Sequence, residues 1–291
     1  MKTITIKTAI IAITILTSIS TIAQKVYVDV NVGYALPLKG GVDGASTTTT
    51  TYYNEQTGER NQSETYKSIN SSLGKGLNFG GSVGYMFNKN LGFELGLNYI
   101  LGAAIKTEDI RNETYIDFTG ATQKSSSIYT SSTSSNMFQI APTLVLSTGF
   151  EKFNPYAKFG FVMGFGKVTT EIESTSTNWG NSNGIYEFSG GMGFGFTGSI
   201  GAEYALNEKV SLFSELKFMS FSYAPKKGIV TKLTQDGVDQ LPGTTTNQKE
   251  TEFVKEYTND GSVNDNEPSK SVKSYLPYNN IGLNFGVKFS F

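Results

Sequence analysis

The sequence contains no cysteine and no histidine, and only one of its 291 residues is tryptophan. Without cysteine the chain can form no disulfide, offers no thiolate and cannot be a lipid-anchored lipoprotein. Without histidine it lacks the group most often used for acid–base catalysis and zinc binding. The 24 basic and 25 acidic side chains nearly cancel, so no charge excess points to a nucleic acid partner. We therefore expect no cofactor, no ordinary zinc site and no histidine- or thiol-based enzyme.

Long apolar runs are also scarce, and the one exception lies at the amino terminus. Lys2 and Lys7 precede an apolar run from Ile10 to Ile22, which is followed by the small residue Ala23. This order is typical of a secretory signal peptide. The run is too short for a membrane anchor, because a spanning helix needs about 20 apolar residues. We predict a signal peptide at 1–23 and a mature domain at 24–291.

The mature sequence alternates apolar and polar residues with period two, as half-buried strands do. In the first such segment Val26, Val28 and Val30 share one face, while Tyr27 and Asp29 share the other. Most segments reach the roughly 9–11 residues that a tilted strand needs to cross a bilayer. The alternation predicts strands at 25–36, 76–87, 91–103, 136–146, 155–168, 188–206, 210–223 and 278–291.

The connections between these eight segments alternate in length. Long connections fall at 37–75, 104–135, 169–187 and 224–277, and short turns fall at 88–90, 147–154 and 207–209. Such alternation gathers all long connections at one end of an antiparallel sheet. The chain is predicted to be all-β, an eight-stranded antiparallel transmembrane up-and-down β-barrel with four long external loops.

The glycines favour a membrane barrel over a soluble one. Within the predicted strands they share the parity of the polar face, apart from Gly81, Gly190 and Gly198. Small residues suit the crowded interior of an eight-stranded barrel. The large apolar residues then face outward, where only lipid tolerates them as a continuous band. Two of the four loops are rich in Ser and Thr, and Thr47–Tyr53 and Arg60–Ile69 are candidates for a protruding hairpin around Asn54–Glu59.

The final segment, Ile281–Phe291, carries Phe285, Val287, Phe289 and Phe291 on one face. Together with the export signal and the glycine-rich alternation, it resembles the small outer-membrane β-barrel proteins of Gram-negative bacteria, the porin-like and OmpA/OmpX-like family. The resemblance implies an outer-membrane location and contact with outer-membrane lipid and lipopolysaccharide. It also implies that Phe291 and Phe289 form part of an assembly signal read by the barrel-insertion machinery. The connection 224–277 is longer than is usual for this family.

Three groups of side chains are candidate sites. Inward parity predicts a charge network in the periplasmic half of the lumen, four acids and three bases: Asp29, Glu94, Lys158, Glu203, Glu215, Lys217 and Lys288. The external half is expected to be lined mainly by Gly and Asn. Lysines near the external strand ends are candidates for binding lipopolysaccharide phosphates, or for simple loop solubility: Lys39, Lys75, Lys106, Lys167, Lys226, Lys227 and Lys273. Asp260, Asp265 and Glu267 favour a solvated acidic loop over a calcium site, because their spacing fits no calcium loop.

The sequence favours a non-enzymatic protein whose barrel anchors large surface loops for adhesion, shielding or envelope structure. The alternative is a small-solute channel, which would need an open lumen in a barrel of only eight strands. A weaker alternative is a membrane partner that docks a larger complex through its last loop. Any surface ligand or protein partner is expected to bind through 37–75 and 224–277.

Overall fold

The computed structural model describes residues 25–38, 42–259 and 261–291. The predicted signal peptide, Lys39 and Asp260 lie outside these ranges. The described chain is all-β, as predicted, and its helices are two single turns, η1 (Leu241–Gly243) and α2 (Thr246–Lys249). None of the described helices is long and apolar enough to cross a membrane. Strands make up most of the rest and join into one 17-stranded sheet.

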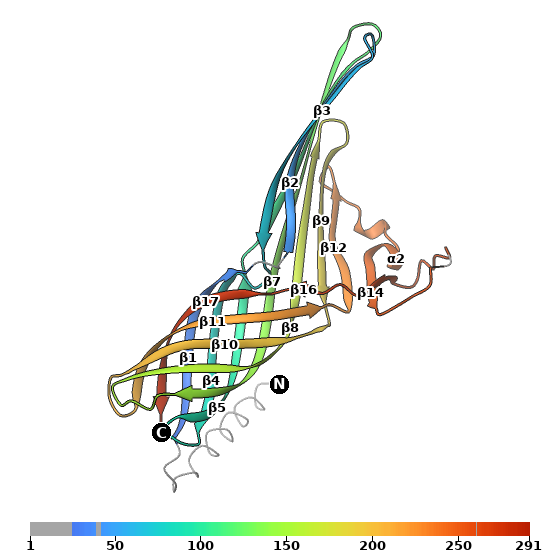
Figure 1. Cartoon of the computed structure of the whole chain (residues 1–291). Coiled ribbons are helices and arrows are strands. Elements are labelled where there is room, and N and C mark those ends of the chain that lie inside the picture. The colour runs from blue at the N-terminus through green and yellow to red at the C-terminus, as the bar shows by residue number, and fades with distance from the viewer. Residues whose placement is uncertain (1–24, 39–41, 260) are drawn as a thin grey trace.

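Part of this sheet closes on itself. Each strand of this part pairs antiparallel with the next along the chain, and β17 pairs with β1 with Val30 opposite Val287, so the pairings return to their start. We call this part the ring (Figure 1). Its strands are β1 (Lys25–Pro37), β4 (Gly76–Met86), β5 (Leu91–Gly102), β7 (Thr122–Ser147), β8 (Phe153–Ser176), β10 (Met192–Ala205), β11 (Val210–Ala224) and β17 (Asn280–Ser290).

Two of the short turns at the carboxyl-terminal end of the ring are built in the same way. Asn88 begins the turn between β4 and β5, and its Oδ1 accepts hydrogen bonds from the backbone N–H groups of Asn90 and Leu91. Asn207 does the same for Lys209 and Val210 between β10 and β11. An asparagine that bonds the backbone two and three residues ahead favours a tight reversal, which brings consecutive strands into antiparallel pairing.

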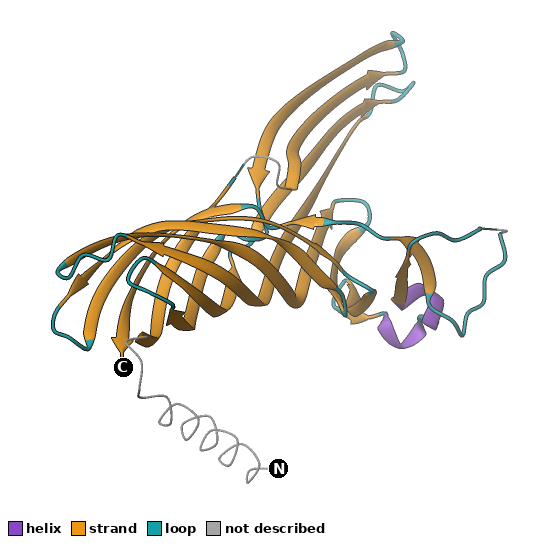
Figure 2. Cartoon of the chain, turned by 60° about the horizontal axis from the view of Figure 1, so that its bottom comes forward, coloured by secondary structure: helices purple, strands orange, loops and turns teal. Residues whose placement is uncertain are grey.

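Beyond the opposite end of the ring the sheet continues as an open wall that we call the extension, which Figure 2 shows leaving the ring opposite the carboxyl terminus. β7 pairs with β5 in the ring over 136–146 and with β6 in the extension over 122–133. β2 pairs antiparallel with β3 and parallel with β6. The extension contains β2 (Val42–Asn54), β3 (Glu59–Ser71), β6 (Ile105–Ile116), the outer parts of β7 and β8, β9 (Gly180–Ser189), β12 (Lys227–Gln235), β13 (Val238–Asp239), β14 (Glu250–Val254) and β15 (Ser269–Val272); β16 (Leu276–Pro277) pairs with β11.

The extension corrects the expectation of long loops. The predicted hairpin is confirmed, since β2 and β3 pair around the turn after Asn54. Yet most of 104–135 and 169–187 is also strand. These segments lack apolar alternation because neither face is fully buried, and their Ser, Thr and Tyr residues stabilise strands through cross-strand pairs instead. The predicted strand 188–206 is in fact two strands, which separate at Gly190 with φ +78°.

The outer face of the ring carries large apolar side chains around its circumference. Most of them are between about 40% and 65% exposed, so they are not part of the buried core. This confirms the predicted outward parity along the ring strands. Examples from successive strands are Val30, Phe79, Leu97, Leu144, Phe161, Phe194, Leu216 and Phe285.

The inner face holds large aromatic rings as well as the small residues that were expected there. The glycines provide their space. A Cβ at Gly84 would lie 2.0 Å from the ring of Tyr27, and one at Gly201 would lie 2.7 Å from the ring of Tyr156. A Cβ at Gly164 would lie 2.4 Å from Phe221. Glycine and aromatic residues therefore complement one another across neighbouring strands.

The half of the lumen nearer the extension, which was expected to be lined mainly by Gly and Asn, is instead filled by an apolar cluster. We call this cluster the plug; it consists of Leu73, Ile100, Ile105, Met137, Ala141, Val162, Val168, Met219, Phe221, Tyr223 and Tyr278. Tyr278 and Leu73 come from segments that precede ring strands and fold over the mouth. Tyr278 donates its backbone N–H to Phe221 O, and Leu73 donates to Pro277 O. The plug closes the end of the ring from which the extension rises.

Candidate functional site

The predicted lumen charges come from six strands of the ring. Asp29 lies on β1, Glu94 on β5, Lys158 on β8, Glu203 on β10, and Lys288 on β17. Glu215 and Lys217 both lie on β11. Inward parity buries the carboxylates deeply, with Asp29 only 2% exposed and Glu94 and Glu215 each 6% exposed. Charges this far from water require partners.

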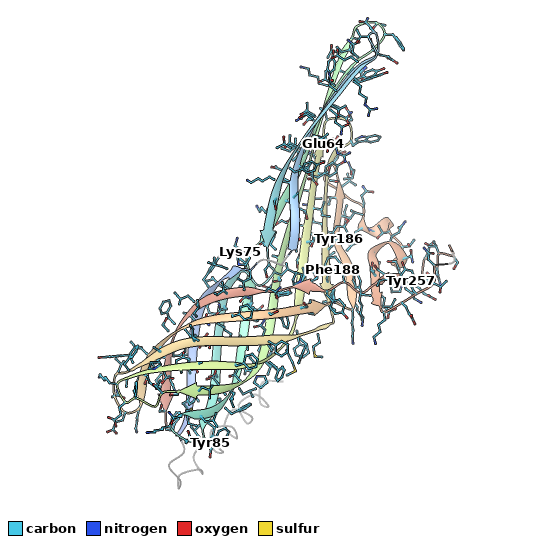
Figure 3. All side chains as sticks on the ribbon, in the orientation of Figure 1. Glu64, Lys75, Tyr85, Tyr186, Phe188 and Tyr257 are labelled. Atoms are coloured by element: carbon cyan, nitrogen blue, oxygen red, sulfur yellow. The ribbon has the colours of Figure 1, made fainter. Side chains whose placement is uncertain are left out.

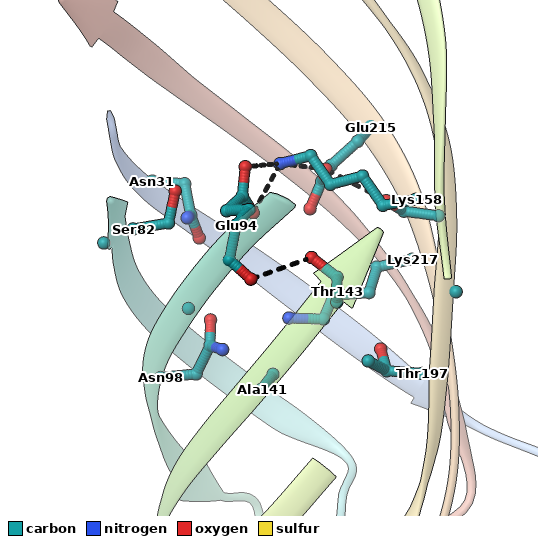
Figure 4. A pocket seen from close by; sticks show the side chains of 14 residues that line it. Asn31, Ser82, Glu94, Asn98, Ala141, Thr143, Lys158, Thr197, Glu215 and Lys217 are labelled. Carbon is teal, nitrogen blue, oxygen red and sulfur yellow. Dashed lines mark hydrogen bonds and ion pairs between the residues drawn. The ribbon is translucent and has the colours of Figure 1, made fainter. Parts of the chain in front are cut away.

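Lys158 is the centre of the larger cluster (Figure 4). Its Nζ lies 2.8 Å from both carboxylate oxygens of Glu94 and 3.6 Å from Oε2 of Glu215. The hydroxyl of Tyr27 donates to Glu94 Oε2 at 2.7 Å. One ammonium group therefore joins acids from β5 and β11 across the lumen, and a buried tyrosine completes the coordination of Glu94.

Uncharged side chains donate hydrogen bonds to the other two deeply buried carboxylates, those of Glu215 and Asp29. Glu215 accepts hydrogen bonds from Tyr156 and Ser199, each at 3.2 Å, and from Asn284 Nδ2 at 3.1 Å. Asp29 accepts one from the hydroxyl of Ser82. Such hydrogen bonds stabilise a buried carboxylate, and they supplement the longer contact of Glu215 with Lys158, whereas Asp29 has no ion pair among the described residues.

A second, separate pair lies near the carboxyl terminus. Lys288 Nζ is 2.7 Å from Glu203 Oε1 and 3.9 Å from the centre of the Tyr27 ring. Asp29 sits opposite Lys288 in the β1–β17 register, but Lys288 contacts the other acid. Among the described residues neither Asp29 nor Lys217 has an ion pair within 4.0 Å. The structure therefore brings the seven predicted residues into one lumen as a cluster and a pair, with Lys217 apart from both.

Sequence reasoning missed the uncharged members of this site. Tyr27, Tyr156, Ser82, Ser199 and Asn284 all share the inward parity of the charged residues. Parity alone places them on the inward face, as it did for Tyr27 beside Asp29, but only charged residues were assigned to the network. Which neutral donor meets which carboxylate depends on the register between strands, which alternation does not encode.

Little free space remains between the charge cluster and the plug. A small cavity lined by Asn31, Asn98, Lys217 and neighbouring residues holds about 30 Å³. That is room for roughly two water molecules, at about 10–15 Å³ each. The side-chain oxygen of Asn31 is buried without a hydrogen-bond partner among the described residues, so water in this cavity would satisfy it.

The lysines predicted to lie near the external strand ends do not form one cluster. Lys75 lies where the ring meets the extension, at the end opposite Tyr85 (Figure 3). Lys167 is paired with Glu187 at 2.8 Å, with both side chains partly exposed. Lys106, Lys226 and Lys227 are exposed, whereas Lys75 and Lys273 are half-buried.

The remaining candidates are the two phenylalanines at the carboxyl terminus and the acids of the connection 224–277. Phe289 and Phe291 are exposed, and Phe291 donates its backbone N–H to Val26 O at 2.9 Å, which joins the chain end to β1. In the last long connection, the described acids form no group of three or more that could hold a metal ion. Glu267 instead accepts a hydrogen bond from the Asn264 side chain.

A family model described as an outer membrane protein beta-barrel domain matches residues 8–240. Among solved structures, this chain is similar to the attachment invasion locus protein Ail of Yersinia pestis. The TM-score is 0.35 at 8% identity, covering 93% of this chain and 100% of that one. The complex of Ail with the heparin analogue sucrose octasulfate gives a TM-score of 0.29 at the same identity and coverage. No match was found among curated proteins.

The contacts of Lys158 predict a large effect on stability. Lys158→Met keeps the length of the side chain but leaves Glu94 without its ionic partner. We expect the free energy of unfolding to fall by about 3–5 kcal/mol, and by less if water enters the lumen. The matched control is Lys167→Met, which removes a partly exposed pair and should cost at most about 1 kcal/mol. Urea unfolding in lipid vesicles measures both; equal losses would contradict a buried network.

Proposed function

This chain belongs to the outer membrane protein beta-barrel domain family, and from that premise we propose that the ring is an eight-stranded transmembrane barrel that anchors a surface-exposed extension. The observation that carries the proposal is the band of exposed apolar side chains around the ring. Soluble proteins rarely expose contiguous apolar patches larger than a few hundred Å². A hydrocarbon environment removes this cost, because lipid tails contact such side chains on every side.

The two ends of the ring support one orientation in the membrane. One end carries short turns and the carboxyl terminus, and the other carries the extension (Figure 1). Barrels of bacterial outer membranes have short turns on the periplasmic side and long connections outside the cell. The predicted signal peptide at 1–23 provides the export that this location requires. The extension is therefore proposed to project from the cell surface.

The filled lumen favours an anchor over the alternative of a small-solute channel. Ion pairs and hydrogen bonds occupy the carboxyl-terminal half, the plug occupies the other, and a cavity of about 30 Å³ lies between them. Eight strands enclose an interior just wide enough for side chains. The barrel is thus proposed to be closed and non-enzymatic, with the extension as its working surface for adhesion, shielding or envelope structure.

The absence of cysteine allows a direct test of this orientation. Ser63→Cys places the only thiol on β3 in the extension, and Glu208→Cys places it in the turn between β10 and β11; both positions are exposed. A membrane-impermeant maleimide should label Ser63→Cys in intact cells and should label Glu208→Cys only after permeabilisation. Labelling of Glu208→Cys in intact cells, or protection of Ser63→Cys, would show that the orientation is wrong.

Planar bilayer recording separates the anchor from the channel. The purified protein should insert without steady conductance, because neither the plug nor the charge cluster leaves a continuous path. Phe221→Ala combined with Tyr223→Ala removes two fully buried plug side chains and should still give no steady conductance, because the charge cluster closes the other half of the lumen. Steady conductance in the unaltered protein would contradict the closed barrel.

Outer-membrane lipid and lipopolysaccharide remain the proposed partners of the lysines at the end of the ring that bears the extension, which we call the rim. Exposed Lys226 and Lys227 follow β11, at the end of the ring that bears the extension. Basic groups near anionic headgroups contribute about 1 kcal/mol each. Phe289 and Phe291 keep their proposed role in recognition by the insertion machinery. The test of that role is the amount of protein that reaches the membrane after Phe291 is deleted.

The rim proposal predicts a difference between the two ends of the ring. Replacing Lys226 and Lys227 with Glu should reduce the lipopolysaccharide that co-purifies with the protein. Replacing Lys89 and Lys209, which lie in the turns at the other end, makes the same charge change and should leave it unaltered. Equal amounts in both double variants would leave these lysines with a role in solubility alone.

A further inference from the structure

The extension contains a hollow on the sheet face that continues the lining of the lumen. Within the single strand β7, the odd-numbered Met137 and Gln139 are buried inside the ring, and the odd-numbered Ser127 and Tyr129 line the hollow. Its other walls come from β6, the end of β8 and the turn from β8 to β9. The hollow holds about 160 Å³, against about 30 Å³ for the lumen cavity.

The turn that forms one wall of the hollow is held firmly in place. The backbone N–H of Thr177 donates to Ser126 O at 3.0 Å, and the Thr177 hydroxyl accepts from the Ser126 N–H at 2.7 Å. The side chain of Gln235 on β12 donates to Trp179 O at 2.7 Å. Trp179 is nevertheless 80% exposed. A large aromatic side chain on a fixed backbone can bind a partner at little cost in ordering.

The polar groups around Trp179 have unused hydrogen-bonding capacity. The side chains of Arg111, Asn178 and Trp179 are exposed, and among the described residues they form no hydrogen bond and no ion pair within 4.0 Å. A hydrogen bond from Tyr66 and, more weakly, the charge of Arg111 lower the pKa of the Glu64 carboxyl on β3, but no direct contact occupies the guanidinium group. Glu113 accepts only one hydrogen bond, from Ser125 at 3.3 Å. The hollow therefore offers free donors on three side chains and a carboxylate acceptor, beside the exposed rings of Trp179 and Tyr129.

This combination selects one class of ligand. A purely apolar ligand would bury Arg111 and Glu113 without partners, and each buried polar group left unsatisfied weakens binding by roughly fivefold to 150-fold. A phosphate or other compact anion would meet the carboxylate of Glu113. A sugar ring has hydroxyl groups that both donate and accept at its edge, and C–H groups on its faces that pack against aromatic rings.

We infer that this hollow is a saccharide-binding site, with Trp179 and Tyr129 as the stacking surface and Arg111, Glu113 and Asn178 as hydroxyl partners. The inference rests on the proposed function, which places the extension outside the cell, where saccharides are exposed. Pockets for drug-sized ligands measure roughly 300–1,000 Å³, so a hollow of about 160 Å³ suits a single sugar ring or chain end. The source is either the cell's own lipopolysaccharide or a foreign glycan.

Because Trp179 is the only tryptophan, its fluorescence reports on the hollow alone. The full-length mature protein in detergent micelles, which contain no other tryptophan, is titrated with two sets of probes. One set contains methyl glycosides of hexoses and N-acetylhexosamines, and the other contains oligosaccharide released from the lipopolysaccharide of the expressing cells. A saturable change in Trp179 emission with at least one probe is expected, and the set that contains the tighter ligand identifies the source.

Calorimetry on variants tests whether the named side chains bind that probe. Trp179→Ala and Arg111→Ala should each weaken binding roughly tenfold or more, as removal of a central aromatic or Arg contact does. The matched control is Phe118→Ala, which removes a 71% exposed aromatic side chain on the neighbouring β6–β7 turn outside the hollow. Its affinity should equal that of the unaltered protein.

Two outcomes would overturn the inference. One is that no saccharide alters Trp179 emission, whether or not a peptide does. The other is that Phe118→Ala weakens binding as much as Trp179→Ala. The cysteine labelling described above separates this failure from a failure of the proposed function, because surface labelling at Ser63→Cys without saccharide binding would leave the anchored extension intact.

Discussion

The constraint on which the structure depends is the narrow interior of the closed ring. Eight paired strands leave room for side chains and little else, so every inward residue must fit against those on neighbouring and opposite strands. This explains why Gly84 lies beside Tyr27 and Gly201 beside Tyr156. The same crowding brings Lys158 within reach of acids from two other strands. Size and charge are therefore matched across the lumen rather than along the sequence.

The closed ring also makes the extension possible. β7 and β8 are longer than the other ring strands and run without interruption from the ring into the open wall. Their pairing within the ring holds the bases of these strands, and β6 and β9 then add to their outer parts. The extension needs no separate core of its own, because a continuous ladder of backbone hydrogen bonds connects it to the ring.

The plug separates two environments of the same sheet face. On the ring side, inward residues are buried and bonded to one another. Beyond the plug, residues of the same parity, such as Ser127 and Tyr129, border the hollow beside Trp179. A single alternation along β7 therefore serves packing at one end and lines the proposed binding hollow at the other. This division of one strand is consistent with a closed anchor that displays a binding surface.

Alternation in the sequence was enough to predict the all-β class, the parts of the eight strands that form the ring and the inward parity of Asp29, Glu94 and Lys158, because period-two alternation records the two faces of a sheet. It did not predict how far β7 and β8 run beyond the ring. The extension was largely missed, since segments such as 122–133 bury neither face completely and leave no such record. Only the tertiary structure decided that Lys288 pairs with Glu203 and that Tyr278 and Leu73 close the mouth. Those contacts join residues far apart in the chain, and the register and curvature of the closed ring set their distances.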